Sequence, residues 1–309
     1  MGSERIAVLG NGIIGHGVAQ IFAAAGHPVA MIGRNAASLD AAKQKIAASL
    51  AEFAANGLLT ATEAEAALGR IVIGTSLEAA RNAAMVVEAV TEDIPLKLKL
   101  FGELDTLCGP ETILASSSGQ PASALVANVK HRQRVIATHF WYPPQLIPLV
   151  EICGGPHCAP DVLERTVALV RGTGKEPVVI EKEVKGFIGN RLQFALLREA
   201  WALWADGIAS AEAIDAVVKA SFGRRIDITG PIESADIGGL ATMVSFGNSL
   251  IPDLSTAQQA PEKVAALLNK GGMPGIYDWS KRDAAALRAD RMEELFRWLK
   301  ADREARSSK

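Results

Sequence analysis

Short apolar runs recur along the chain and are separated by longer segments that mix polar and apolar residues. The runs are a few residues long and rich in Val and Ile, as is typical of strands buried on both faces. They are Ile6 to Leu9, Val29 to Ile32, Ile71 to Ile73, Met85 to Val90, Thr112 to Ala115, Val135 to Thr138, Leu149 to Ile152 and Val178 to Val184. Each is predicted to be a strand.

Segments with helical spacing of apolar positions lie between these runs. In the longest, Leu39, Ile46 and Phe53 recur at that spacing until Asn56-Gly57 breaks the pattern. The predicted helices are Ile13 to Ala25, two within Ala36 to Leu68, Leu77 to Asn82, Pro95 to Leu107 and Pro121 to Ala127. Alternating strands and helices predict an α/β fold, a doubly wound parallel sheet with helices on both faces.

The pattern changes after Val184 and becomes helical. Lys185-Gly186 is the expected hinge between the two parts. The helices beyond it are Phe187 to Ala205, one that begins at Ser210, and a charged closing helix from Arg282 to Ala301. We therefore predict a Rossmann-type nucleotide-binding domain over residues 1–184, followed by an all-helical C-terminal domain over residues 185–309.

The first strand ends in the sequence GNGIIG, and a helix follows it directly. Gly10, Gly12 and Gly15 have the G-x-G-x-x-G spacing of a dinucleotide-binding turn. The first glycine permits the turn, the second lets the backbone approach a pyrophosphate, and the third lets the helix pack closely on the strand. The free N–H groups of the helix start, near Ile13 and Ile14, favour an anion. A dinucleotide site is predicted here.

The residues after the second strand bear on which dinucleotide binds. NAD sites usually carry an acid there for the ribose hydroxyls, whereas NADP sites lack it and supply an arginine for the 2′-phosphate. This chain has Gly33-Arg34-Asn35, without an acid. We predict NADP(H) as the preferred cofactor. NAD is the alternative, with Arg34 a solvated residue at a helix start.

Composition narrows the classes of function. The net charge of −2 gives no positive field to gather nucleic acid or anionic lipid. The uncharged stretch between Arg5 and Arg34 is rich in glycine and polar residues, so no membrane span is expected. Three cysteines favour a reducing, cytoplasmic compartment. Cys153, His157 and Cys158 lack the further ligand of a closed zinc site, and no metal is predicted.

Polar residues follow several of the predicted strands, where α/β sheets bind ligands: Glu92, Ser116 to Ser118, and His139. His139 and Glu151 stand at two neighbouring strand ends. Such a pair can form a dyad, in which the acid holds one imidazole nitrogen and the other takes a proton from a substrate hydroxyl. Removing hydride from a carbinol requires that proton to leave. The alternative is a structural histidine before an aromatic residue.

Five segments in order, GNGIIG, VVEAVTED, ILASSSG, HFWYPPQLIPLVEI and GFIGNRLQFALLREAW, resemble the 3-hydroxyacyl-CoA dehydrogenase superfamily over nearly the whole chain. NRLQFA, EAW, GRRIDITGPIE and the basic C-terminal helix look most like the L-gulonate 3-dehydrogenase (lambda-crystallin) branch, which oxidises free 3-hydroxy acids. The resemblance implies an NAD(P)-dependent dehydrogenase that interconverts a 3-hydroxy acid and its 3-oxo form. It also implies a homodimer formed through the helical domain, which closes the substrate cleft.

The resemblance further implies roles for single residues. His139 matches the general base, and Glu151 matches the residue that orients it. Ser118, with Ser117 as the alternative, matches the serine that bonds the substrate oxygen, and Asn190 matches an asparagine near nicotinamide and substrate. The residues expected to line the cofactor cleft after the fourth and fifth strands are Ala89, Val90, Glu92, Lys97 and Ser116.

Two more positions concern the substrate. Tyr142 stands where the family often has Asn, which implies an altered pocket, with a packing role as the alternative. Arg225 matches an arginine of the free-acid branch and can clamp a carboxylate, unless it faces solvent beside Arg224. Two other functions stay open at this point: an L-3-hydroxyacyl-CoA dehydrogenase for a short-chain CoA thioester, and a catalytically silent dinucleotide-binding or structural protein.

Overall fold

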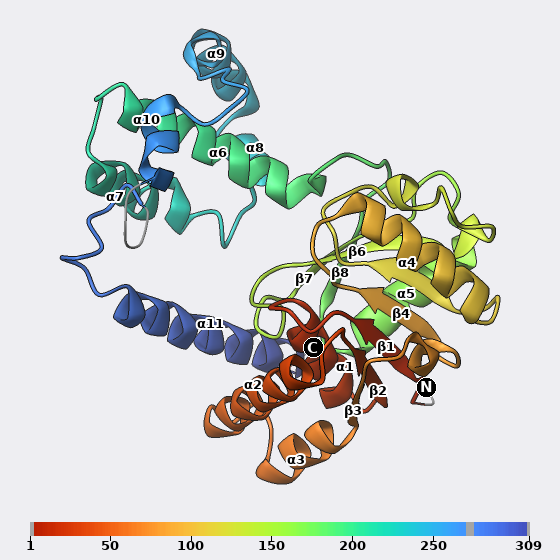
Figure 1. The fold of residues 1–309 in the computed structure, drawn as a ribbon. Coiled ribbons are helices and arrows are strands. Elements are labelled where there is room, and N and C mark those ends of the chain that lie inside the picture. The colour runs from red at the N-terminus through yellow and green to blue at the C-terminus, as the bar shows by residue number, and fades with distance from the viewer. Residues whose placement is uncertain (1–2, 270–274, 308–309) are drawn as a thin grey trace. The chain divides into compact units, whose positions relative to one another are not determined.

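The computed structural model describes residues 3–269 and 275–307. The chain forms two compact units (Figure 1). The sheet unit comprises the described residues up to Ile188 together with those from Ala289 onward. The helical unit comprises Gly189–Arg288. Each is described by itself below.

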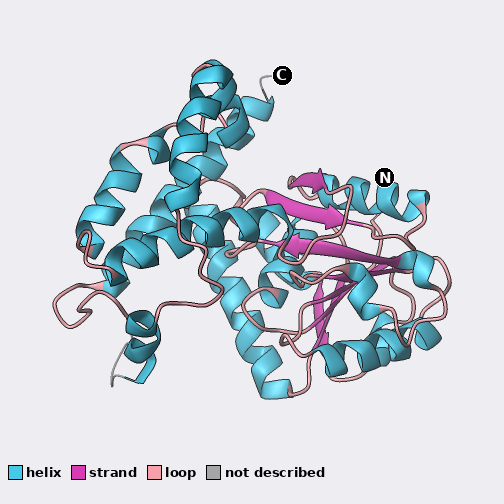
Figure 2. Cartoon of the chain, turned by 90° about the horizontal axis from the view of Figure 1, so that it is seen from above, coloured by secondary structure: helices cyan, strands magenta, loops and turns pink. Residues whose placement is uncertain are grey.

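Eight strands form one sheet in the order β3-β2-β1-β4-β5-β6-β7-β8. Figure 2 shows the helices in cyan and the strands in magenta. Their bounds are β1 (Ile6–Leu9), β2 (Val29–Ile32), β3 (Ile71–Gly74), β4 (Met85–Glu88), β5 (Ile113–Ser116), β6 (Val135–Phe140), β7 (Leu149–Cys153) and β8 (Glu176–Val179). The first six strands are parallel, as predicted. β7 runs antiparallel to β6 because residues 141–148 are too short for a parallel crossover, which needs about a dozen residues.

Helices cover both faces of the sheet, which confirms the predicted α/β class. They are α1 (Gly15–Ala24), α2 (Ala36–Ala55), α3 (Ala61–Gly69), α4 (Ile94–Leu107) and α5 (Pro160–Gly172). Side chains cap three of them: Asn35 caps α2, Thr60 caps α3 with Glu63 in a capping box, and Asp93 caps α4. The segments predicted as helices near residues 77–82 and 121–127 are short 3₁₀ turns instead.

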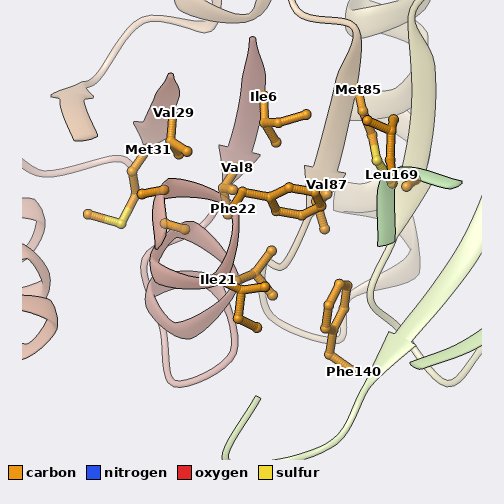
Figure 3. Packing of buried hydrophobic residues seen from close by; sticks show 14 of the residues in the cluster. Ile6, Val8, Ile21, Phe22, Val29, Met31, Met85, Val87, Phe140 and Leu169 are labelled. Atoms are coloured by element: carbon orange, nitrogen blue, oxygen red, sulfur yellow. The ribbon is translucent and has the colours of Figure 1, made fainter. Parts of the chain in front are cut away.

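The two faces of the sheet bury two separate apolar layers, because strand side chains alternate. Ile6 and Val8 of β1 pack against Phe22 of α1 on one face (Figure 3). Ala7 and Leu9 point to the other face, where α4 contributes the fully buried Phe101. α1, α2, α3 and α5 lie on the first face and α4 on the second. The strand ends between these layers are thereby held rigidly in place.

The closing helix α11 (Ala284–Ser307) ends on the sheet unit. Phe296 and Leu299 are buried there in a cluster with Phe53 and Leu58, and Arg303 Nη1 donates to the Leu58 carbonyl at 2.7 Å. The sequence analysis placed these last residues with the helical domain. The structure differs because apolar side chains of α11 bury themselves against α2 and the loop after it.

The helical unit contains no strand in its described residues. Its elements are most of α6 (Phe187–Ala205), α7 (Ala211–Ala220), α8 (Pro231–Ile237), α9 (Leu240–Leu250), α10 (Glu262–Ala265) and several 3₁₀ turns. The strand expected at Val178 to Val184 is β8, which lies earlier because it follows the register of β7. Among the described residues, no helix is both long enough and apolar enough to cross a membrane.

Candidate active site

The glycine turn after β1 has the geometry that its motif predicts. Gly10 has a φ of +112°, and a Cβ there would lie 2.4 Å from the Ala89 carbonyl oxygen. A Cβ on Gly15 would lie 2.1 Å from the carbonyl oxygen of Gly10. Around Gly12, in contrast, a Cβ would meet nothing within 4 Å. Two glycines therefore serve close packing, and the middle one leaves open space for a ligand.

A pocket of about 580 Å³ opens beside this turn. It lies at the carboxyl ends of β1 and β4, where the strand order reverses and where α/β sheets bind ligands. Six of the residues predicted to bind the cofactor line it: Gly10, Gly12, Gly33, Arg34, Ala89 and Val90. The open turn, the glycine packing and the pocket together fit a dinucleotide.

The end of β2 forms one wall of this pocket. A Cβ on Gly33 would lie 2.8 Å from Asn11 Oδ1 and 3.1 Å from Leu39, so an acidic side chain cannot replace this glycine without movement. Arg34 and Lys45 both line the pocket. Asn35, predicted to bind the cofactor, instead accepts a hydrogen bond from the Ser38 N–H and caps α2. This wall carries cationic side chains and no acid at position 33.

Lys97 and Ser116, which the sequence predicts at the cofactor cleft, are both buried beneath the surface. Lys97 is 1% exposed, and its Nζ lies 2.9 Å and 3.0 Å from the two carboxylate oxygens of Glu88. Glu88 also accepts a hydrogen bond from Ser116 Oγ at 2.6 Å and one from the Val90 N–H at 2.7 Å. Glu88 thus ties β4, β5 and α4 together. Its signal in the sequence is an acid inside the apolar run Met85 to Val90.

Ser118 and Glu92 continue this network toward the surface. Ser118 Oγ donates to Glu92 Oε1 at 2.6 Å, and Lys97 Nζ lies 3.2 Å from Glu92 Oε2. Burial opposes ionisation of Glu92, but the bonds from Ser118 and Lys97 outweigh it and lower the pKa of Glu92. Ser118 is 5% exposed. The structure therefore brings Ser118 to Glu92, and both stand at the carboxyl edge of the sheet.

His139 and Glu151 come together as predicted. They face each other in the antiparallel register of β6 and β7, and His139 Nδ1 lies 2.8 Å from Glu151 Oε2. The side chains are 12% and 2% exposed. Because β6 is parallel to β1, β4 and β5, His139 stands at the same edge of the sheet as the glycine turn. The pair can hold a proton at Nδ1 and accept another at Nε2.

Four further predicted residues have no contact described with the His139–Glu151 pair. Tyr142 follows β6, and its side chain is 63% exposed. Ile13 of the turn is likewise exposed, at 61%. Asn190, in the first turn of α6, and the exposed Arg225, after a 3₁₀ turn, belong to the helical unit. Their roles stay predictions.

Two family models match consecutive parts of the chain. The NAD-binding domain of 3-hydroxyacyl-CoA dehydrogenase matches residues 5–184, and the C-terminal domain of the same enzyme matches residues 186–275. The first of them covers both the glycine turn and the His–Glu pair.

Individual relatives agree with these models. A 5-formyl-3-hydroxy-2-methylpyridine 4-carboxylate 5-dehydrogenase of Mesorhizobium japonicum is 32% identical over 94% of this chain and 96% of its own. The human lambda-crystallin homolog is 34% identical over 86% of this chain and 85% of its own. A solved structure of a dehydrogenase with the same named substrate as the Mesorhizobium enzyme, described as an NAD⁺-dependent dismutase, superimposes with a TM-score of 0.89. It is 28% identical, and the match covers 98% of this chain and 99% of that chain.

Proposed function

Since the chain belongs to the 3-hydroxyacyl-CoA dehydrogenase family, we propose that His139 and Glu151 are the proton-transfer pair of its hydride-transfer reaction. The enzyme is an oxidoreductase that uses a nicotinamide dinucleotide and acts on a 3-hydroxy compound. The observation that carries the proposal is the 2.8 Å bond between His139 and Glu151 at the sheet edge that also holds the glycine turn.

The residues around the pair determine how a proton moves. A carboxylate can only accept, so Glu151 fixes the imidazole proton on Nδ1 and makes Nε2 the acceptor. Nε2 then takes the substrate hydroxyl proton as the carbinol is oxidised, and Glu151 stabilises the resulting imidazolium. The bound cofactor supplies the hydride acceptor. In the reverse direction the imidazolium returns its proton to the new alkoxide.

Four further residues are proposed to hold the substrate. Ser118 and Asn190 would bond its reacting oxygen, and Tyr142 would line its pocket. Arg225 would bind a carboxylate in two-pronged fashion, which a free acid offers and a thioester does not. The similarity to a dehydrogenase whose named substrate is a free pyridine carboxylate supports a free 3-hydroxy acid over a CoA thioester. A panel of 3-hydroxy and 3-oxo compounds, free and as CoA thioesters, tests it.

We also propose a preference for NADP(H). Arg34 lines the pocket, and position 33 carries no acid to bind the ribose hydroxyls of NAD; a Cβ there would lie 2.8 Å from Asn11 Oδ1, so an acid would require the Asn11 side chain to move. The measurement is kcat/KM with both cofactors, for the wild type and for Arg34→Ala. We expect NADP(H) to be preferred in the wild type and the preference to decrease in the variant. A tenfold preference of the wild type for NAD would overturn the proposal.

A homodimer formed through the helical unit and a cytoplasmic location complete the proposal. Large apolar side chains of this unit are exposed, among them Ile237 at 77% and Phe246 at 65%, and such patches mark interaction surfaces. All three cysteines, Cys108, Cys153 and Cys158, are free thiols, which suits a reducing compartment. Sedimentation of the purified protein at several concentrations tests the dimer.

The variant His139→Ala tests the function directly. We expect turnover to fall by about 10²–10⁴-fold, the range for a lost general base, while cofactor binding measured by fluorescence stays unchanged. His157→Ala is the matched control, because His157 is exposed and follows β7 only a few residues beyond Glu151. Turnover of His139→Ala close to that of the control would mean that another group moves the proton.

A further inference from the structure

Glu151 receives more hydrogen bonds than a simple His–Glu pair requires. Trp141 Nε1 donates to Glu151 Oε2 at 3.1 Å, on the same oxygen that His139 Nδ1 contacts. The backbone N–H of Ile188, at the start of α6, donates to Glu151 Oε1 at 2.9 Å. Glu151 is 2% exposed, so these bonds act in a medium where each is stronger than in water.

The imidazole of His139 is also enclosed by two aromatic rings. The Trp141 ring lies edge-on to it with centroids 5.5 Å apart, and the Phe187 ring lies at 5.7 Å. Phe187 is fully buried, and its φ of 50° is an unusual backbone conformation for a residue other than glycine. Strained residues of this kind persist only where the surrounding structure holds them, often at functional sites.

From these contacts we propose that Trp141 is a positioning residue that acts on His139 through Glu151. This inference rests on the proposed function of the dyad. The indole N–H holds the shared carboxylate oxygen in place, so His139 Nδ1 meets it in one orientation. It also withdraws part of the carboxylate charge from the imidazole, because a hydrogen bond donated to an anion stabilises and disperses its charge.

The indole N–H changes the charge that His139 faces in a definite direction. The contacts described for the pair include the neutral indole of Trp141 after β6, and the Phe187 ring and Ile188 N–H of α6. With the indole N–H in place, Glu151 attracts the imidazolium less strongly. Without it, the carboxylate keeps more charge toward His139 and the imidazole holds its proton to higher pH. A ring that merely packs would have no such effect.

The first experiment therefore removes the N–H and keeps a ring. In Trp141→Phe, we expect the titration midpoint of the His139 imidazole, followed by ¹⁵N NMR, to rise by about half to one pH unit, given the size of hydrogen bonds to charged groups. The resonance is assigned by its loss in His139→Ala. If the variant does not fold, benzothienylalanine incorporated at position 141 replaces the N–H by sulfur in a ring of nearly the same shape.

A second variant separates this role from packing. Phe140 is a buried ring on β6, next to His139 in the chain. For Phe140→Leu we expect a lower melting temperature and an unchanged titration midpoint of His139. In a Glu151→Gln background, Trp141→Phe should no longer move the midpoint, because the residue through which it acts has lost its charge. An unchanged midpoint in Trp141→Phe, or an equal shift in the Gln background, would overturn the proposal.

The NMR titration needs no turnover, so its outcome is independent of whether the dyad is catalytic. A shifted midpoint together with full activity of His139→Ala would refute the proposed function and leave the Trp141 coupling intact. An unshifted midpoint together with an inactive His139→Ala would do the reverse. Where both hold, the acid limb of the kcat/KM profile of Trp141→Phe should move to higher pH by the same amount.

Discussion

Two histidine–carboxylate pairs among the described residues of the sheet unit have similar geometry and different surroundings. His139 Nδ1 lies 2.8 Å from Glu151, and His131 Nδ1 lies 3.1 Å from Asp105. Asp105 also pairs with Arg134, whose Nη2 lies 2.8 Å from the same Oδ1. The hydrogen-bond donors described above for Glu151 are, besides His139, a neutral indole and a neutral amide.

The comparison shows that the third partner decides what such a pair can do. Burial opposes the charge of Asp105, but Arg134 and the neighbouring N–H groups outweigh it and hold the pKa of Asp105 below its ordinary value. Its charge is already balanced by a guanidinium, and the His131 side chain is 49% exposed. The donors described for Glu151 besides His139 are neutral, and a carboxylate in such surroundings can stabilise an imidazolium. The His131–Asp105 pair fastens a loop, and the His139–Glu151 pair suits proton transfer.

Removing the charge of Glu151 should give the largest effect. Glu151→Gln keeps the size of the side chain, but an amide cannot stabilise the imidazolium or enforce the proton on Nδ1. We expect kcat to fall by about 10²–10⁴-fold with little change in melting temperature. Steady-state kinetics with the best substrate of the panel measures it. A kcat within threefold of the wild type would show that the two pairs do not differ in the way proposed.

The sequence predicted this difference only in part. Placing His139 and Glu151 at neighbouring strand ends was enough to predict their contact, because register follows once two strands pair. The strands themselves were found because they are short, apolar and separated by clear turns. The predictions of the family and of the α/β class are confirmed as well. Both depend on patterns that are local in the chain.

The third partners could not be predicted, because they depend on side-chain directions in three dimensions. Nothing in the order of residues indicates that Lys97 turns inward to Glu88, or that Ser118 bonds Glu92. In the sequence, Trp141 is one of several aromatic residues near the end of β6. Its bond to Glu151 depends on the antiparallel return of β7. Sequence patterns thus located the site, and packing determined the chemistry of each polar group in it.

Removing the charge of Asp105 should affect stability instead of turnover. In Asp105→Asn, Arg134 keeps its charge at 2% exposure and loses its counterion. We expect the free energy of unfolding to fall by about 3–5 kcal/mol, as for other broken buried ion pairs. Denaturant unfolding measures this loss, and kcat per folded molecule should stay at the wild-type value. A large loss of kcat with unchanged stability would reverse the assignment of the two pairs.

The same carboxylate should make the stability of the protein sensitive to acid. The pKa of Asp105 is lowered in the folded state, so its contribution is complete above the ordinary value of about 3.9 and is lost as pH falls through the lower folded value. In that range the unfolded chain binds more protons than the folded one. We expect Asp105→Asn to lose less stability than the wild type between about pH 4 and pH 2. Parallel slopes for the two proteins would contradict this.

Removing the histidine of the structural pair should have the smallest effect. His131 is half exposed, and Asp105 keeps its bonds to Arg134 and to the Lys130 N–H when the imidazole is lost. His131→Ala should therefore cost less than about 1 kcal/mol of stability, as is usual for exposed ion pairs, and leave kcat and its pH profile unchanged. Comparing kcat of this variant with that of His139→Ala tests whether any histidine near a carboxylate suffices for activity. If both variants lose turnover equally, the partner of the carboxylate is not what distinguishes them.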